Sequence, residues 1–547
     1  MLVNWMKRKV VLSVIMAAIM IIAVGCQAVG GVDLNQMLKQ TLKVTSYEGS
    51  QTFEFKLLME DEGLDGGSAE ETAIFDLISH IKLTLDDIKV KDAANMSLKG
   101  KLELGTKSIG FSLAMNEELA VLNLEGAKKP IVLELGELAS SGLFGEILGT
   151  DFSDGTHTEG TVTAVPDKAE QESLAKTGQQ LIETVAGYAI ENMPNPTRLK
   201  VSPAQETVRG ETVNAMHVQA ELTGKEIYTW VKSYMDALVS DKEGLHEMLT
   251  TVYELIQSQE GVLESAGIET ESIFGSIPEE EDQKAMIDDA VDEVVQGISD
   301  LKQEMEQAEK EDPNFIDLFF NDETYVKADL FVDSKLDIRK SVMEMSIKPT
   351  VIEDEEDMSF SPFKGVWMKA TSEKSNVNGN VIPVEAVQSK GDLTADQLSE
   401  MEGYQVLRQF KTDSVAYDIL RNQMHISRQQ IQMHPEYSYN PPIVTPAGIT
   451  LIPLRDTADR LGADLKATAK GKSITINDFA TSTVIELKSG SKQAIINGKA
   501  VNWSFPVTAV DGITYVPARD FVKSLGGKVY WEDSYDDEKV LVIEREL

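Results

Sequence analysis

The sequence predicts an α+β protein in which a large antiparallel, half-barrel-like sheet is covered by helices and followed by a small duplicated α+β domain. Three observations predict this fold class. Apolar and polar residues alternate over much of residues 53–135, which is typical of antiparallel strands with one solvated face. Between about residues 224 and 310 the apolar period becomes helical. Near the C-terminus, residues 448–464 recur 64 positions later as residues 512–528.

The first residues predict a lipoprotein signal peptide over residues 1–25. Basic residues 7–9 precede an apolar run of about 15 residues, which is short of the roughly 20 that a membrane-spanning helix needs. Cys26, the only cysteine of the chain, follows this segment. The three residues before it resemble a lipobox: Ala23, Val24 and Gly25. We therefore expect a diacylglyceryl group on Cys26, a tether over residues 26–32, and lipid anchoring on the extracellular face of the cell membrane.

Composition argues against several classes of function. The chain has 51 Lys and Arg against 90 Asp and Glu, and its net charge of −39 repels nucleic acid. With the lone cysteine taken by lipid, no intramolecular disulfide forms, so stability must come from packing. No segment matches a calcium-binding EF-hand loop, and the acidic run at residues 353–357 is expected to be a solvated loop.

Residues 33–390 are expected to form one large α+β domain, with a split near residue 200 as the alternative. An amphipathic helix with Leu34 and Met37 on its apolar face leads the domain. Period-two alternation then predicts strands at residues 53–57, 81–85, 96–98, 109–115 and 131–135. Further strands are predicted at residues 325–332, 336–347, 367–374 and 381–387.

Two helices are predicted between the two groups of strands. The first carries Ile227, Trp230 and Val231 on one face. The second begins with Ser276 as its cap and carries Val294 and Met305 on its apolar face, while its opposite face is almost wholly acidic. These helices are expected to cover the sheet.

This order of elements, with a leading helix, a long strand meander and a helical layer, resembles the LolA/LppX-like family of envelope lipoprotein carriers. In that family a curved antiparallel half-barrel holds an acyl chain against helices. The resemblance covers residues 33–390 and implies an apolar cavity on the inward face of the sheet. The alternative is that the same side chains fill one another's space as an ordinary core.

A polar, helical connector is expected at residues 391–435. It ends at a proline-rich segment, which marks the start of the C-terminal part. Residues 436–547 then form the duplicated domain. Each copy of the repeat predicts a strand, a helix started by proline, a glycine stop and another strand. The residues that match at the two helix starts are Pro453, Arg455 and Asp456 in the first copy, and Pro517, Arg519 and Asp520 in the second.

These helix starts, together with residues 496–499 and 530–532, resemble the copper amine oxidase-like N-terminal domain, a small stalk module of Gram-positive surface proteins. The resemblance covers residues 436–547 and departs at residues 465–467, where a tryptophan-aspartate pair is usual. It implies an appendage without chemistry of its own, because copper in these oxidases is held by histidines of a separate domain. We expect the two repeat arginines, Arg455 and Arg519, to bind carboxylates or helix ends within the fold.

The sequence offers no catalytic, metal or cofactor site. Thr250 stands where a zinc-protease helix beginning at His246 would need its second histidine. Nucleophile-elbow, phosphate-loop, dinucleotide and paired-cysteine motifs are also absent. The six histidines lie apart in the sequence and are expected to be surface or core side chains: His80, His157, His217, His246, His425 and His434. We therefore expect no enzymatic activity and no cofactor.

Two functions remain open for a membrane-anchored, non-catalytic envelope protein. In the first, the chain is an interaction or scaffold protein that contacts a cell-wall component or a protein partner. In the second, the N-terminal half-barrel is a carrier or sensor that binds a hydrophobic ligand. An apolar cavity of roughly 300–1,000 Å³ would favour the second function, and a filled core would favour the first.

Overall fold

The computed structural model forms two compact units and confirms the α+β class. It describes residues 33–59, 69–135, 168–259, 261, 280–311, 313–350, 363–468, 473–533 and 539–547. The N-terminal unit runs to Glu125 and continues over Pro130–Thr394, while the C-terminal unit contains Gly126–Lys129 and Ala395–Leu547. Most of the expected connector therefore groups with the C-terminal unit instead of standing between two domains.

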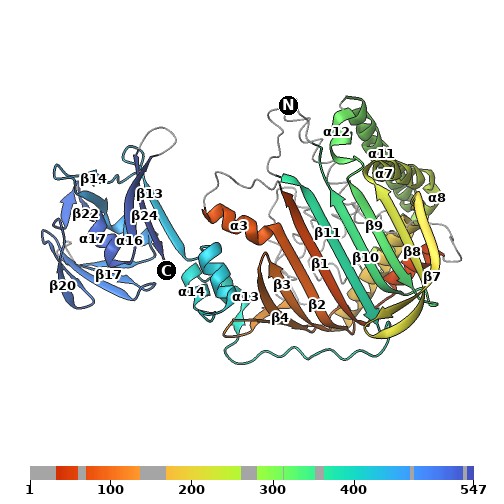
Figure 1. Cartoon of the computed structure of the whole chain (residues 1–547), viewed down its shortest axis with the longest axis horizontal. Coiled ribbons are helices and arrows are strands. Elements are labelled where there is room, and N and C mark those ends of the chain that lie inside the picture. Colours follow the sequence, from red (N-terminus) through yellow and green to blue (C-terminus); the bar gives the residue numbers. More distant parts are fainter. Residues whose placement is uncertain are drawn as a thin grey trace. The chain divides into compact units, whose positions relative to one another are not determined.

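The N-terminal unit is built on one twelve-stranded sheet (Figure 1). Its strands are β1 (Tyr47–Met59), β2 (His80–Val90), β3 (Met96–Leu104), β4 (Lys107–Met115), β5 (Leu119–Leu124), β6 (Ile131–Glu134), β7 (Arg198–Val208), β8 (Glu211–Thr223), β9 (Tyr325–Val332), β10 (Ile338–Ile347), β11 (Phe363–Ser375) and β12 (Leu393–Thr394). Their order across the sheet is β12-β6-β5-β4-β3-β2-β1-β11-β10-β9-β8-β7. Neighbours are antiparallel except for the short pair β12 and β6. The predicted antiparallel meander is thus confirmed, and β1 joins its two halves.

One predicted strand, residues 381–387, is wrong, because this segment forms no strand. Pro383 lacks the N–H group that a central ladder position needs. Val381 and Ala386 of this segment are 2% and 5% exposed, whereas Ile382, Val384 and Val387 are 74%, 58% and 58% exposed. Two hydrogen bonds hold this segment: the Val384 N–H donates to Ser97 Oγ at 2.9 Å, and Asn116 Nδ2 donates to the Ala386 carbonyl at 3.3 Å.

Cross-strand register gives the sheet one apolar and one polar face. Phe53 of β1 lies opposite both Leu83 of β2 and Ala370 of β11, and Ala370 lies opposite Met343 of β10. Because directly opposite residues share a face, these side chains form one apolar row across four strands. The positions next to them along the strands are mostly polar and belong to the other face: Glu54, Lys82, Thr84, Glu344, Lys369 and Thr371.

The helices of this unit gather at the β7–β10 end of the sheet, except for α3 (Figure 1). They are α2 (Leu34–Leu42), α3 (Ala69–Ser79), α6 (Lys168–Glu191), α7 (Gly224–Ser240), α8 (Lys242–Gln257), α11 (Glu280–Glu311) and α12 (Pro313–Phe319). Leu34 and Met37 of α2 pack on β8 and β9 through a cluster that includes Val218 and Leu330. A second cluster joins α7 to the same strands and contains Trp230.

The helical layer covers the same face to which Phe53 belongs. Val326 of β9 is buried in the cluster that contains α7, and it lies opposite Met345 of β10. On the next strand Met345 lies opposite Met368 of β11, and Met368 lies opposite Phe55 of β1. Residues 53 and 55 are two apart in β1, so their side chains share a face. The apolar face is therefore buried under helices at β8 and β9 and continues from there across β10, β11, β1 and β2.

The predicted helical faces are confirmed for α7 and only in part for α11. Ile227, Trp230 and Val231 of α7 are buried, and so is Met305 of α11. Val294, which was expected on the buried face of α11, is 38% exposed, while Ile287 and Val291 are buried in its place. The α6 helix was not predicted at all, because its sequence is mostly polar.

The C-terminal unit contains three small sheets around two helices of equivalent position. Its helices are α13 (Ala395–Ser399), α14 (Gly403–Leu407), α15 (Val415–Asp418), the π-helical turn η2 (Ile419–Gln423), α16 (Leu454–Arg460) and α17 (Ala518–Ser524). Its strands are β13 (Arg428–Met433), β14 (Ile443–Val444), β15 (Thr450–Pro453), β16 (Asp464–Ala467), β17 (Ser473–Asp478), β18 (Thr483–Lys488), β19 (Gln493–Ile496), β20 (Lys499–Asn502), β21 (Thr508–Val510), β22 (Ile513–Pro517), β23 (Lys528–Asp533) and β24 (Lys539–Glu546). The sheet orders are β13-β24-β23, β14-β15-β22-β21 and β16-β17-β18-β19-β20.

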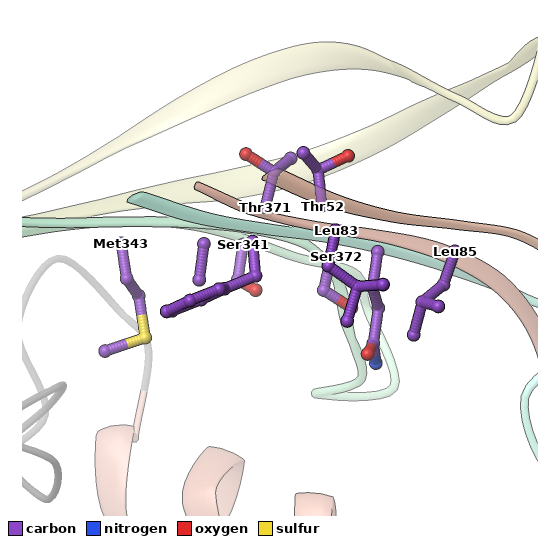
Figure 2. Close-up of a pocket in the computed structure, with 10 residues that line it drawn as sticks. Thr52, Leu83, Leu85, Ser341, Met343, Thr371 and Ser372 are labelled. Atoms are coloured by element: carbon purple, nitrogen blue, oxygen red, sulfur yellow. The ribbon is translucent and has the colours of Figure 1, made fainter. Parts of the chain in front are cut away.

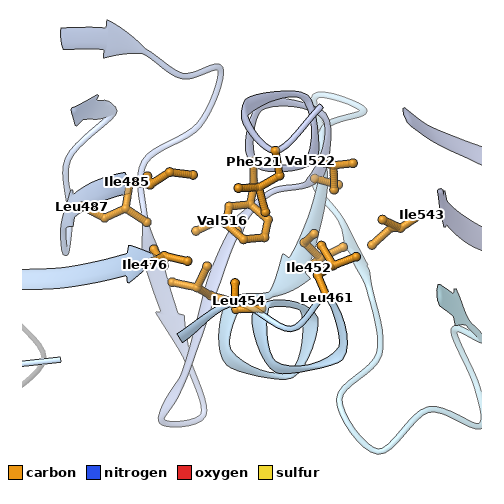
Figure 3. Packing of buried hydrophobic residues seen from close by; sticks show 14 of the residues in the cluster. Ile452, Leu454, Leu461, Ile476, Ile485, Leu487, Val516, Phe521, Val522 and Ile543 are labelled. Atoms are coloured by element: carbon orange, nitrogen blue, oxygen red, sulfur yellow. The ribbon is translucent and has the colours of Figure 1, made fainter. Parts of the chain in front are cut away.

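Side chains from both repeats fill one core in this unit. Leu454 and Leu461 of the first repeat and Phe521 of the second converge there with residues from the sheets (Figure 3). Strand β13 corrects the prediction that residues 395–433 are helical. It pairs with β24 over its whole length, and its alternate residues Ile431 and Met433 are buried in the core or beside it.

Candidate functional site

The predicted lipid-anchor residues lie outside the residues that the structure describes. This holds for Cys26, for the lipobox Ala23, Val24 and Gly25, and for the signal peptide and tether. The acidic run 353–357 and the expected cap Ser276 lie outside them as well. None of the helices in the described part of the chain is long and apolar enough to cross a membrane.

The candidate site is a groove of about 310 Å³ on the sheet of the N-terminal unit. It spans β2, β1, β11 and β10 and is lined by Gln51, Thr52, Phe53, Leu83, Leu85, Ser341, Met343, Ala370, Thr371 and Ser372. Figure 2 shows Leu83, Leu85, Met343, Ser341 and Ser372 on one side of the strands, and Thr52 and Thr371 on the other. The side chains that project into the groove therefore come from the apolar face.

The groove differs from a closed core in exposure and differs from a polar cleft in charge. Phe53, at its centre, is 42% exposed among the described residues. No Asp, Glu, Lys or Arg is among the described residues that line it. Thr52 and Thr371 project from the opposite side of the strands, so the polar side chains on the groove side are Gln51, Ser341 and Ser372. The described lining therefore offers apolar area and no ion-pair partner for a charged ligand.

The opposite face of the sheet is charged and well paired. Glu54 accepts from Lys56 Nζ and is in contact with His80 Nε2, both at 2.8 Å. The hydrogen bond with Lys56 is the largest cause that lowers the pKa of Glu54, and it outweighs the opposing effect of burial. Further along, Lys340 Nζ lies 2.7 Å from Glu206 and 3.3 Å from Glu373. This face therefore stays ionised and solvated, and an apolar ligand would have only the other face to bind.

The residues that match between the two repeats lie at the same positions around α16 and α17, and both arginines are exposed. Pro453 and Pro517 are buried and immediately precede α16 and α17. Arg455 and Arg519 are exposed, and neither forms an ion pair or hydrogen bond with a described residue. Their binding to carboxylates or helix ends within the fold stays a prediction. Both arginines lie at the second position of their helices.

The two repeat aspartates have different partners. Asp520 accepts two hydrogen bonds from Ser504, from its N–H at 2.8 Å and its Oγ at 2.5 Å. Among the described residues, the partner of Asp456 is Arg460, whose Nη1 lies 3.9 Å away one helical turn later. Pro453, Arg455 and Asp456 line a hollow of about 450 Å³ in the C-terminal unit. The second repeat thus satisfies its aspartate internally, and the first does not.

The arginine that organises this unit is Arg545, which the sequence analysis missed. Its Nη1 lies 2.7 Å from Asp478 Oδ2, and the two side chains are 1% and 0% exposed. Its Nη2 donates to the Leu461 carbonyl and its Nε to Gln429 Oε1, both at 2.6 Å. A signal was present, because residue 545 shares the parity of Leu541 and Ile543 in a strand whose odd positions face the core.

The described residues do not form a copper site. No group of three or more His, Cys, Asp or Glu side chains in this part of the chain could hold a metal ion. Four of the histidines each contact one carboxylate, while His157 lies outside the described residues. The pairs are His80 with Glu54, His217 with Asp329, His246 with Asp288 and His425 with Glu546.

Fold and site thus define an α+β protein with a half-covered apolar sheet and a separate, duplicated C-terminal unit. A family model described as the copper amine oxidase N-terminal domain matches residues 430–538. This match confirms the C-terminal resemblance and begins inside β13, slightly before the expected boundary at residue 436. The matched domain is the N-terminal, non-catalytic one of these oxidases. No curated protein matches the chain.

Proposed function

We propose that this chain is a lipid-anchored, non-catalytic protein of the cell envelope whose N-terminal unit binds an apolar ligand such as an acyl chain. The observation that supports the proposal is the groove on the apolar face, whose described lining residues carry no charge and include Phe53, which is 42% exposed. Its volume of about 310 Å³ falls at the lower end of the range of ligand sites. The C-terminal unit would then serve as the interaction module of the anchored chain.

The chemistry of the groove selects the ligand class. Each methylene group that moves from water onto this surface contributes about 0.8 kcal/mol, so a run of ten contributes about 8 kcal/mol before the cost of ordering the ligand. A charged ligand would lose hydration without gaining an ionic partner, because no charged side chain is among the described residues that line the groove. A saturated hydrocarbon chain loses nothing in this way.

Substitution of Leu83 with aspartate tests the groove directly. The change Leu83→Asp puts a charge on the apolar face, and we expect it to weaken binding of anthroyloxy-labelled stearic acid about a hundredfold. The matched control is Thr84→Asp, which adds the same charge one residue away on the polar face, opposite Lys101. It should leave affinity within about twofold. Equal affinity of both variants and the wild type, or no saturable binding to any of them, would contradict the proposal.

The lipid anchor makes a separate prediction. In Cys26→Ser the side-chain oxygen cannot replace the thiolate that accepts the diacylglyceryl group. We expect metabolic labelling with a radioactive fatty acid to be lost and the protein to leave the membrane fraction. Unchanged labelling in the variant would show that the anchor is assigned to the wrong residue, and would leave the groove proposal intact.

A further inference from the structure

The hollow beside α16 has an internal counterpart in the second repeat. The 64-residue offset that aligns Asp456 with Asp520 also aligns Tyr439 and Asn440 with Trp503 and Ser504. Asn440 and Asp456 both line the hollow. The start of α16 can therefore be compared with the start of α17, to see which residues each repeat packs there.

In the second repeat this place is filled by the chain itself. Trp503 is 3% exposed, and its ring packs edge-on against Phe521 with the ring centres 6.4 Å apart. The next residue, Ser504, satisfies the Asp520 carboxylate through its backbone N–H and its hydroxyl. An aromatic residue followed by a donor thus closes the start of α17.

In the first repeat the described residues do not fill the equivalent place. Tyr439 is 98% exposed, so the aromatic ring is not inserted. The hollow of about 450 Å³ has an apolar part formed by Leu454, Leu465, Ile474 and Ile513, and a polar part formed by Asn440, Arg455, Asp456 and Asp459. Its Asp456 carboxylate lacks the serine donors that Asp520 has.

We propose that this hollow binds an extended peptide segment that presents an aromatic side chain followed by a residue with a hydroxyl group. The aromatic ring would rest on Leu465 and Ile513, which are partly exposed, since Leu454 and Ile474 are 1% and 3% exposed and belong to the core. The backbone N–H and the hydroxyl would donate to Asp456, as Ser504 does to Asp520. Both parts of the hollow are then used, and the exposed Arg455 can pair with a carboxylate of the peptide.

A peptide with the sequence of residues 499–508, labelled with fluorescein, is the natural probe, since it carries the Trp503-Ser504 pair in its own context. Fluorescence anisotropy with the full chain should show saturable binding. Asp456→Ala should weaken it about tenfold, because hydrogen bonds to a charged acceptor are lost. The matched control Glu486→Gln removes an exposed acid from the same unit and should change nothing. Alanine in place of the peptide's Trp or Ser should also weaken binding about tenfold.

Three results would overturn the proposal. The first is the absence of saturable binding, and the second is binding that Asp456→Ala leaves unchanged. The third is binding that appears only in Tyr439→Ala, which would assign the hollow to Tyr439 of the chain itself. An N-acetylglucosamine tetramer serves as the competing ligand class. If it binds in an Asp456-dependent way and the peptide does not, the hollow is a glycan site and the peptide proposal fails.

Discussion

Replacing Arg545 with methionine is expected to lower the free energy of unfolding of the C-terminal unit by about 3–5 kcal/mol. The reason is the Asp478 carboxylate, which is 0% exposed and would remain in the core without its cation. Thr481 also donates to Asp478 Oδ2, but a hydroxyl cannot offset a full charge. The Leu461 carbonyl and Gln429 would lose their donor at the same time.

Hydrogen exchange followed by mass spectrometry on peptides from β17 and β24 measures this change within the full chain. The control is Arg428→Met, which removes a partly exposed arginine from the same sheet and should cost about 1 kcal/mol or less. The double variant Arg545→Met with Asp478→Leu should regain most of the loss, since no unpaired charge remains. A loss below about 1 kcal/mol for Arg545→Met would contradict the buried-pair account.

The second large effect is expected at Trp230 of α7. Trp230→Ala should cost about 3–5 kcal/mol of N-terminal unit stability, because the ring is buried against Tyr234 and its Nε1 donates to the Pro194 carbonyl at 2.8 Å. Phe53→Ala should cost about 1 kcal/mol or less, since that ring is exposed in the groove and leaves no closed cavity.

Urea unfolding and fatty-acid titration of both variants separate the two parts of the apolar face. Phe53→Ala should weaken binding of the labelled stearic acid, while Trp230→Ala should change stability and leave the affinity of the folded fraction within about twofold. If Phe53→Ala destabilised as strongly as Trp230→Ala, the groove would be an ordinary packed core, and the carrier function would lose its main support.

The sequence allowed the strands of the sheet to be predicted, but it did not show which helices cover them. Alternation alone predicted the strands at residues 53–57 and 81–85, because the period of a strand is two residues, and the structure places Phe53 and Leu83 on one apolar face. Whether a helix lies over a given position depends on residues far away in the chain, such as Val326 beneath α7. The prediction of a strand at residues 381–387 failed for a local reason, since Pro383 has no N–H group for a ladder position.

Residues at equivalent positions of the two repeats do not make equivalent contacts. Arg455 and Arg519 match in sequence yet are both exposed, whereas Arg545 has no sequence counterpart of note and lies at the centre of a buried network. Asp456 and Asp520 match as well, but only Asp520 has a serine beside it in space. Pairing in space could not be predicted from one copy, because the partner comes from a different segment of the chain.

Native mass spectrometry of the Cys26→Ser chain, purified without detergent, tests the central claim most directly. Without the covalent lipid, any added mass reports a ligand held by the folded protein. We predict about one bound lipid or fatty acid per chain, retained when Thr84→Asp is added and lost when Leu83→Asp is added instead. A chain that carries no apolar ligand, and takes up none when incubated with fatty acid, would contradict the account.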